Sequence, residues 1–357
     1  MRPMTAPLLI GVDFSSRPTP RKPVTLATGN LRGAVLQLGA ARRFDTLPAL
    51  ADWLAGPGPW VGGFDLPFGL PRELVQTLGW PADWAACMDH YAALPRPAIR
   101  DLFAAFCAAR PAGGKFAHRA CDGPAGSSPS MKWVNPPVAW MLHAGVPLLR
   151  SAGVHLPGLQ AGDLARVALE AYPGLLAAEV LGKRRSYKSD DVAKQTPDRL
   201  IARKDLITAL ESGRTRLGVT LKLTHAQRDA LAADASGDSL DAVLCLLQAA
   251  WVLKRDAGFS MPEALRVVAE PAGATGLAAR CLRGRATWCA GDASRARARC
   301  FPLNAWRIQA ALQAAEVGRW LAAICFSAVP RRRTVSRFAT TGRQRKVSGG
   351  RSQLRTS

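Results

Sequence analysis

The chain has 357 residues, of which 48% are hydrophobic and 21% charged, and this composition is typical of a globular protein with ample material for a core. The best apolar run, residues 242–253, is shorter than a membrane span, and the apolar stretch 7–12 is too short for a signal peptide. We therefore expect a soluble, cytoplasmic protein with no membrane partner.

The net charge of +22 is concentrated at one end of the chain. From Arg280 onwards, 17 Lys or Arg residues stand against two acids, so this segment carries +15 of the total. Such a segment either binds nucleic acid or is an arginine-rich end that folds poorly. The sequence pattern also changes abruptly near residue 270, and a shifted reading frame in the gene would produce such a change. We predict that residues 269–357 form an irregular, Arg-rich, basic C-terminal extension that is weakly ordered or disordered.

The eight cysteines are scattered along the sequence. No two of them have CxxC spacing, and no histidine lies at zinc-finger spacing from a pair. The pattern argues against a zinc site, and scattered free thiols fit a reducing compartment.

The first part of the chain predicts the order strand, strand, strand, helix, strand. Apolar and β-branched runs predict the strands at residues 8–14, 24–30, 34–39 and 60–66. Gly29, Asn30 and Gly33 offer turn residues between the second and third strands. Residues 46–55 have helical spacing, with Thr46 as a possible N-cap. This order is that of the start of a ribonuclease H-like sheet, in which the first three strands are antiparallel and the fourth is parallel to the first, but many other α/β folds start similarly.

The region of about 72–165 has a different character and is rich in Trp, Pro and Ala. Its helical patches at 97–109 and 137–152, on either side of a polar, glycine-rich stretch at 111–131, predict a helical insertion with a flexible loop. Beyond it we predict a strand, a loop and two helices, at residues 166–171, 181–198, 199–212 and 224–233.

A strong helix then opens at Ser236-Gly237-Asp238 and runs through Lys254, with Ser236 or Asp238 as its cap. Because this helix is apolar on nearly all faces, we expect it to pack on the sheet. These elements predict the fold class α/β, a mixed sheet flanked by helices over residues 1–268, and the order of the first five elements is compatible with a ribonuclease H-like sheet.

Five acids lie at the ends of apolar elements. Asp13, Asp65 and Glu170 each close a predicted strand, and Asp238 and Asp241 share one face of the last helix. Acids beside buried elements are costly unless they are paired or bind a metal, and ligands gather at the carboxyl ends of strands. Clustered carboxylates suit Mg²⁺ or Mn²⁺, and two such ions could hydrolyse a phosphodiester. The alternative for each acid alone is a helix cap or a loop residue, with Asp238 as the clearest case.

Seven short segments of the chain occur together in one order. They are GVDFS at 11–15, FDLPFGLP at 64–71, HRACD at 118–122, VNPPVAWM at 134–141, ALEAYPGLL at 168–176, YKSDD at 187–191 and SGDSLDAVLCLLQAA at 236–250. The set resembles, over roughly residues 8–255, the domain-of-unknown-function 429 family, which is described as predicted nucleases with a ribonuclease H-like fold. The hundred or so residues after the last helix lie outside the resemblance.

The resemblance implies a metal-dependent nuclease-like site. It implies that Asp13 is the first-strand acid that bridges metals, Asp65 the fourth-strand acid, and Asp241 or Asp238 the acid of the final helix. Glu170 is expected beside them on the strength of the resemblance more than of its position.

Several basic residues are candidates for binding substrate. Lys115, His118 and Arg119 lie in the glycine-rich loop, and Lys188 follows the strand of Glu170. Arg and Lys suit phosphate oxygens, and His could transfer a proton. The alternatives are a solvated polar loop and a surface turn. The tryptophans of the insertion could stack bases, although core packing is the stronger interpretation.

The sequence thus predicts a hydrolase, a metal-dependent nuclease acting on RNA or DNA. Its catalytic residues would be Asp13, Asp65, Glu170 and Asp241, with Asp238 as a further metal ligand. The alternative function is a non-catalytic module of the same fold that binds a nucleotide or nucleic acid.

Overall fold

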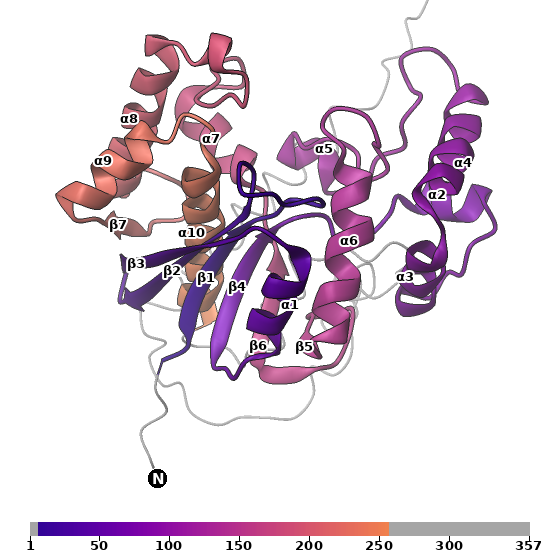
Figure 1. Ribbon diagram of the computed structural model, residues 1–357, viewed down its shortest axis with the longest axis horizontal. Coiled ribbons are helices and arrows are strands. Elements are labelled where there is room, and N and C mark those ends of the chain that lie inside the picture. The colour runs from indigo at the N-terminus through magenta and orange to yellow at the C-terminus, as the bar shows by residue number, and fades with distance from the viewer. Residues whose placement is uncertain (1–5, 257–357) are drawn as a thin grey trace, which may run out of the picture. The chain divides into compact units, whose positions relative to one another are not determined.

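The structure, a computed structural model, describes residues 6–256, so the predictions made for residues 269–357 lie outside the described residues. It is a mixed α/β fold whose seven-stranded sheet has the order β5-β6-β4-β1-β2-β3-β7 (Figure 1). The strands are β1 Leu8–Asp13, β2 Val24–Arg32, β3 Val35–Phe44, β4 Trp60–Asp65, β5 Val154–His155, β6 Asp163–Glu170 and β7 Thr220–Lys222.

Ten α-helices and a short 3₁₀ helix surround this sheet within the described residues. The helices are α1 Leu47–Ala55, α2 Arg72–Thr77, α3 Trp84–Ala93, α4 Arg96–Ala108, α5 Asp122–Ala125, α6 Val138–Ser151, α7 Pro173–Leu181, η1 Val192–Lys194, α8 Pro197–Glu211, α9 His225–Ala233 and α10 Asp238–Asp256. None of the helices between residues 6 and 256 has the length and the apolar character needed to cross a bilayer.

The directions of the first four strands agree with the prediction. β1 is antiparallel to β2, β2 is antiparallel to β3, and β4 is parallel to β1. The turn between β2 and β3 is tighter than predicted, because Arg32 pairs with Val35 and leaves only Gly33 and Ala34 between the strands. Gly33 has φ 60°, which glycine adopts without steric cost, whereas Gly29 and Asn30 lie inside β2.

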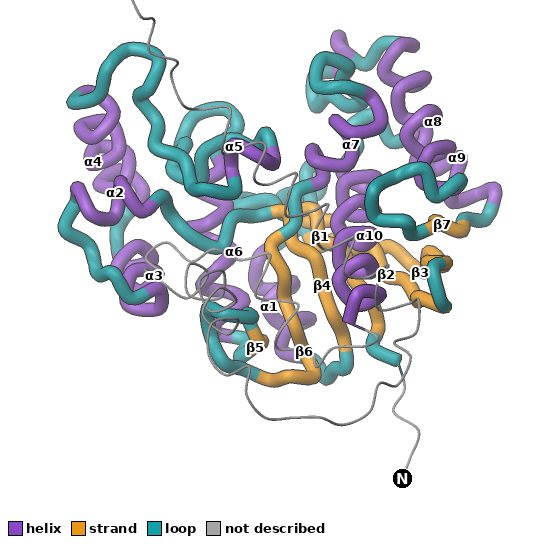
Figure 2. Tube along the Cα trace, turned by 180° about the vertical axis from the view of Figure 1, so that it is seen from behind, coloured by secondary structure: helices purple, strands orange, loops and turns teal. Residues whose placement is uncertain are grey.

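Alternating side chains give the sheet two buried faces. Ile10 and Val12 point into the core shared with α1 and α6, and Leu9 points into the core shared with α10. Figures 1 and 2 show α1 and α6 on one face and α10 on the other. Thr46 caps α1 as predicted, since its hydroxyl accepts a hydrogen bond from the Ala49 amide at 3.3 Å.

The helices α2 to α6 fall between β4 and β5, where the sequence predicts the helical insertion. Its tryptophans pack inside the protein. Trp84 is 5% exposed and donates a hydrogen bond to the Phe68 carbonyl at 2.6 Å, and the partly buried Trp80 and Trp140 pack against the same core. These contacts favour core packing over base stacking.

Candidate metal centre

Three aspartates from three separate elements meet at one end of the sheet. Asp13 is the last residue of β1, Asp65 is the last residue of β4, and Asp241 lies in the first turn of α10. One carboxylate oxygen from each lies within 4.8 Å of the other two. Asp13 and Asp65 are register partners on parallel strands, so their side chains leave the sheet on the same face.

Two glycines allow α10 to bring Asp241 to that face. Gly11 and Gly63 lie two residues before Asp13 and Asp65, on the same side of the sheet. A Cβ atom at Gly11 would lie under 3.0 Å from the backbone of Ala242 and Leu246, and one at Gly63 would overlap the Cys245 carbonyl oxygen. Because these two positions have no side chain, the helix backbone packs directly on β1 and β4. This close approach places Asp241 beside the two acids at the strand ends.

Asp241 is fully buried and is held by two neighbouring residues of one loop. The Tyr187 hydroxyl donates a hydrogen bond to Oδ1 of Asp241, and the Lys188 ammonium forms an ion pair with Oδ2. The loop itself is anchored from α8, because Arg203 donates to the Tyr187 carbonyl and Arg199 donates to the Lys188 carbonyl, both at 2.8 Å. Lys188 was predicted as a phosphate ligand or as part of a surface turn, and the structure places it at the carboxylates.

Burial and mutual repulsion raise the pKa values of the three carboxyls. Burial raises the pKa of Asp65 to about 7, with the Asp241 charge as the next cause, and burial followed by Asp241 raises that of Asp13 well above its usual value. The pKa of Asp241 is also raised by burial, although Lys188 and Tyr187 oppose the shift. Burial alone would lower the pKa of Lys188, but attraction to Asp241 and Asp13 raises it.

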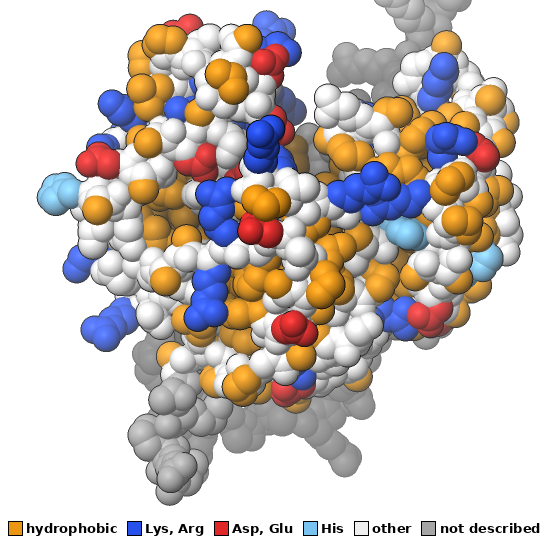
Figure 3. All heavy atoms as spheres, viewed as in Figure 1, with side chains coloured by type: hydrophobic (Ala, Val, Ile, Leu, Met, Phe, Trp, Pro, Cys, Tyr) orange, Lys and Arg blue, Asp and Glu red, His pale blue; other side chains and the backbone are white. Residues whose placement is uncertain are grey.

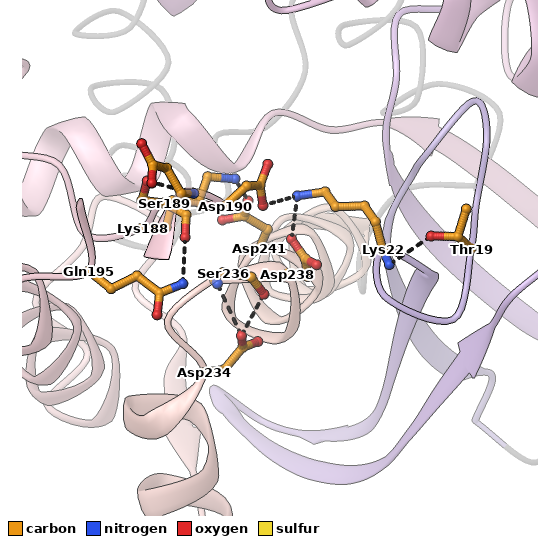
Figure 4. Close-up of polar contacts among 12 residues, drawn as sticks. Thr19, Lys22, Lys188, Ser189, Asp190, Gln195, Asp234, Ser236, Asp238 and Asp241 are labelled. Carbon is orange, nitrogen blue, oxygen red and sulfur yellow. Dashed lines mark hydrogen bonds and ion pairs between the residues drawn. The ribbon is translucent and has the colours of Figure 1, made fainter. Parts of the chain in front are cut away.

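Asp238 lies in the same turn of α10 and has a different partner. The Lys22 ammonium, from the connection between β1 and β2, lies 3.1 Å from Asp238 and 2.5 Å from Asp190 (Figure 4). Asp238 is 5% exposed, and the Lys22 ammonium compensates its buried charge. Asp238 is thus not one of the three carboxylates that lie within 4.8 Å of one another, although its charge raises the pKa values of Asp13 and Asp241.

The cap of α10 is also not the predicted one. Asp234, four residues before Asp238, accepts hydrogen bonds from the amides of Gly237 at 3.2 Å and Ser239 at 2.9 Å, and from the Ser236 hydroxyl at 2.6 Å. Asp238 is the first residue of the helix, and Ser236 is a donor to Asp234 (Figure 4). Neither residue is the cap, because the preceding turn brings Asp234 over the free amides.

Glu170 does not join the aspartates, contrary to the prediction. It is the register partner of Phe64 and not of Asp65, so its side chain leaves the sheet on the opposite face. There the Arg119 guanidinium binds it through two hydrogen bonds, at 2.7 and 2.9 Å. Arg119 also binds Asp122 at 2.9 Å and its side chain is 8% exposed, so the structure places this predicted substrate ligand in an ion-pair network with two acids.

Within the described residues, no hydrogen bond or ion pair joins the remaining predicted substrate ligands to the three aspartates. Lys115 and His118 are exposed on the connection between α4 and α5. Among the described residues, the ion pair and the hydrogen bond to the three aspartates come from Lys188 and Tyr187.

The donor set fits a small divalent cation. All three residues offer carboxylate oxygens, which Mg²⁺ and Mn²⁺ prefer. The group is largely buried, with Asp13 9% exposed and Asp241 0%, so the three carboxylates repel one another and are stabilised by positive charge. Lys188 supplies one such charge at Asp241.

Three residues that contact the acids or the start of α10 could not be assigned these contacts from the sequence. They are Lys22, Tyr187 and Asp234. Lys22 lies among prolines in a polar connection and carries no motif. By contrast, the repeated Gly-x-Asp at 11–13 and 63–65 is a visible signal of two equivalent strand ends. Comparisons with family models, with curated proteins and with solved structures each find no match for this chain.

Proposed function

We propose that this protein is a divalent-cation-dependent nuclease with a ribonuclease H-like fold, as its resemblance to the domain-of-unknown-function 429 family implies. The observation that carries the proposal is the convergence of the Asp13, Asp65 and Asp241 carboxylates within 4.8 Å of one another. The fold assignment is supported by the first four strands, whose order and directions are those expected of a ribonuclease H-like sheet.

A polyanionic substrate, RNA or DNA, is supported by the charges around the carboxylates. The connection between β1 and β2 carries Arg17, Arg21 and Lys22, and Figure 3 shows basic side chains gathered on the surface around it. Clustered Lys and Arg attract phosphate backbones over a distance of about 10 Å at ordinary ionic strength. These residues therefore favour a phosphodiester over a neutral substrate.

In the proposed reaction, the protein binds and orients the groups that react. Asp13, Asp65 and Asp241 would hold Mg²⁺ or Mn²⁺, a Lewis acid that polarises a phosphoryl oxygen and activates water at neutral pH. Tyr187 fixes one oxygen of Asp241 by its hydrogen bond and so orients the other oxygen. Asp13 and Asp65 are held rigidly, because each is the end of a central strand.

The test is a cleavage assay with the purified full chain. Labelled single-stranded, duplex and RNA–DNA hybrid substrates are incubated with Mn²⁺ and with the variants Asp13→Asn and Asp241→Asn. We expect cleavage of at least one substrate and a loss of about 100-fold or more in each variant, because each removes a cation ligand. The control is Asp52→Asn, an exposed aspartate of α1, which should cleave like the wild type.

Two outcomes would contradict this proposal. Cleavage that persists in Asp13→Asn would place the active site elsewhere. Binding of Mn²⁺ and nucleic acid without cleavage of any substrate would instead support the non-catalytic binding module.

A further inference from the structure

The Lys188 ammonium lies where the positive charge of a bound cation would act. It contacts the buried Asp241 directly, and its charge also affects the pKa values of Asp13 and Asp65. Figure 4 shows Lys188 beside Asp241 at the start of α10, whereas Lys22 serves Asp238 and Asp190. Of these two lysines, it is Lys188 that has its carboxylate partner in the group of three.

The backbone of Lys188 is fixed, and its side chain is partly exposed although the ammonium lies against the buried Asp241. The side chain crosses Gly237, where a Cβ atom would lie under 3.0 Å from Cβ and Cδ of Lys188, and Gly237 has φ 78°. The Lys188 carbonyl is held by Arg199. Yet 40% of the Lys188 side chain is exposed, in contrast to 0% for Asp241. The ammonium can therefore turn towards solvent by rotating its outer bonds while the backbone stays in place.

A divalent cation and this ammonium compete for the same oxygen. Asp241 has two carboxylate oxygens, of which Tyr187 occupies one and Lys188 the other. A cation that binds Asp241 through Oδ2 competes with the ammonium, because the two positive charges repel each other strongly when they contact the same oxygen. The displaced ammonium remains on the same loop, beside the cation and facing solvent.

We propose that Lys188 is an exchangeable counter-ion of this centre, which leaves Asp241 when a divalent cation binds and then receives a phosphate group of the substrate. This inference rests on the proposed function and adds an order of binding to it. In the metal-free protein, the Lys188 ammonium is held on Asp241. The cation-loaded protein offers that ammonium to an anion, so cation and phosphate binding reinforce each other.

The first test is Mn²⁺ affinity, measured from the electron paramagnetic resonance signal of free Mn²⁺ in titrations of the full chain. Removing the competitor in Lys188→Met should tighten Mn²⁺ binding by about fivefold or more, the lower end of typical coupling between two ligands. The control, Lys194→Met, removes an exposed lysine of the same connection that is paired with Asp191, and should leave the affinity unchanged. Equal or weaker binding by Lys188→Met would overturn the exchange.

The wild type gives an independent measurement, in which a variant serves only to assign the signal. With lysine labelled at Nζ with ¹⁵N, the ammonium resonance that is absent from the Lys188→Arg spectrum should shift when Mg²⁺ is added, because the ion pair with Asp241 is lost. An unchanged resonance at saturating Mg²⁺ would also overturn the exchange. If Asp13→Asn leaves Mn²⁺ binding unaltered, the proposed cation site itself is wrong, which separates the two failures.

The second test concerns phosphate. Fluorescent 12-nucleotide single-stranded DNA, duplex DNA and RNA are titrated with the protein at saturating Mg²⁺. For any probe that the wild type binds, Lys188→Met should bind more weakly and lose about one unit of salt dependence, whereas Lys194→Met should match the wild type. A Lys188→Met affinity equal to that of the wild type would overturn the assignment of Lys188 to phosphate.

Discussion

Gly11 and Gly63 are register partners on β1 and β4, and the backbone of α10 rests on both of them. Each lies two residues before an aspartate of the centre, so the spacing that admits the helix also sets the distance from the helix to the carboxylates. The packing of α10 and the geometry of the centre are thus one feature of the fold.

We predict that Gly11→Ala and Gly63→Ala both destabilise the protein and weaken Mn²⁺ binding. The added methyl group meets helix backbone, which cannot rotate away, and such overpacking typically costs about 1–3 kcal/mol. Chemical denaturation and Mn²⁺ titration measure the two effects. Gly123→Ala is the control, because a Cβ at Gly123 meets nothing within 4 Å. Wild-type stability in Gly11→Ala would contradict the described packing.

The raised pKa of Asp65 predicts a loss of stability as the pH rises. The folded protein holds a proton up to a pKa of about 7, whereas an unfolded aspartate releases it near about 3.9. Between these values the folded state binds more protons, so the free energy of unfolding falls with increasing pH. We expect Asp65→Asn to remove part of this slope and to stabilise the metal-free protein at pH 7.5 by roughly 1–3 kcal/mol.

Urea denaturation at pH 5 and pH 7.5, with a chelator present, measures this effect. Asp52→Asn provides the comparison, since Asp52 is exposed on α1. A slope in Asp65→Asn identical to that of the wild type would show that Asp65 is ionised in the folded protein at both values.

Arg119 is expected to matter for stability and not for the cation centre. Arg119→Met leaves Glu170 and the fully buried Asp122 side chain without their guanidinium partner, and removing one partner of a buried pair typically costs about 3–5 kcal/mol. The exposed Arg100, paired with Asp101, serves as a control whose loss should change stability by about 0.5 kcal/mol or less. Glu170→Gln should retain wild-type Mn²⁺ affinity, and a clear weakening would return Glu170 to the centre.

Asp234 should stabilise α10 through its cap. Burial opposes ionisation of Asp234, but the hydrogen bonds from Ser236, Ser239 and Gly237 outweigh it and lower the pKa. The stabilisation is therefore present at neutral pH and is lost as the pH falls through that lowered pKa. Asp234→Ala should cost about 0.5–2 kcal/mol at pH 7 in thermal unfolding. Ser236→Ala keeps both hydrogen bonds from backbone amides to Asp234 and should lower the stability less than Asp234→Ala. A larger loss in Ser236→Ala than in Asp234→Ala would contradict the cap.

The sequence is most informative where chemistry depends on local pattern. Asp13 and Asp65 follow buried strands, and Asp241 lies on a helix that is apolar nearly all round, so their convergence follows from the order of the elements. Glu170 has the same local pattern, since it also ends a buried strand. Its position differs because Glu170 of β6 pairs with Phe64 of β4, one residue before Asp65. Such a register depends on packing between strands that are far apart in the sequence.

The residues that surround the centre could not be predicted, for a related reason. Lys22 reaches Asp238 across 216 positions of sequence, and Tyr187 reaches Asp241 across 54. Such contacts depend on loop positions that are fixed by contacts with neighbouring helices. Arg203 of α8, for example, holds the loop of Tyr187 by donating a hydrogen bond to the Tyr187 carbonyl. The cap of α10 was misassigned because Asp234 lies before a turn that folds it back over the helix start.

The position of α10 has a consequence for how the protein is made. Among the described strands, β1 comes first in the chain and lies in the middle of the sheet, and the helix that covers Gly11 is synthesised more than two hundred residues later. Until then, the backbone of β1 and β4 lacks its cover, and Asp13 and Asp65 stand without their third partner. Contacts so distant in sequence form slowly. A chain synthesised only as far as β6 therefore cannot bring the three carboxylates together. Affinity for a divalent cation would report that α10 has packed on the sheet.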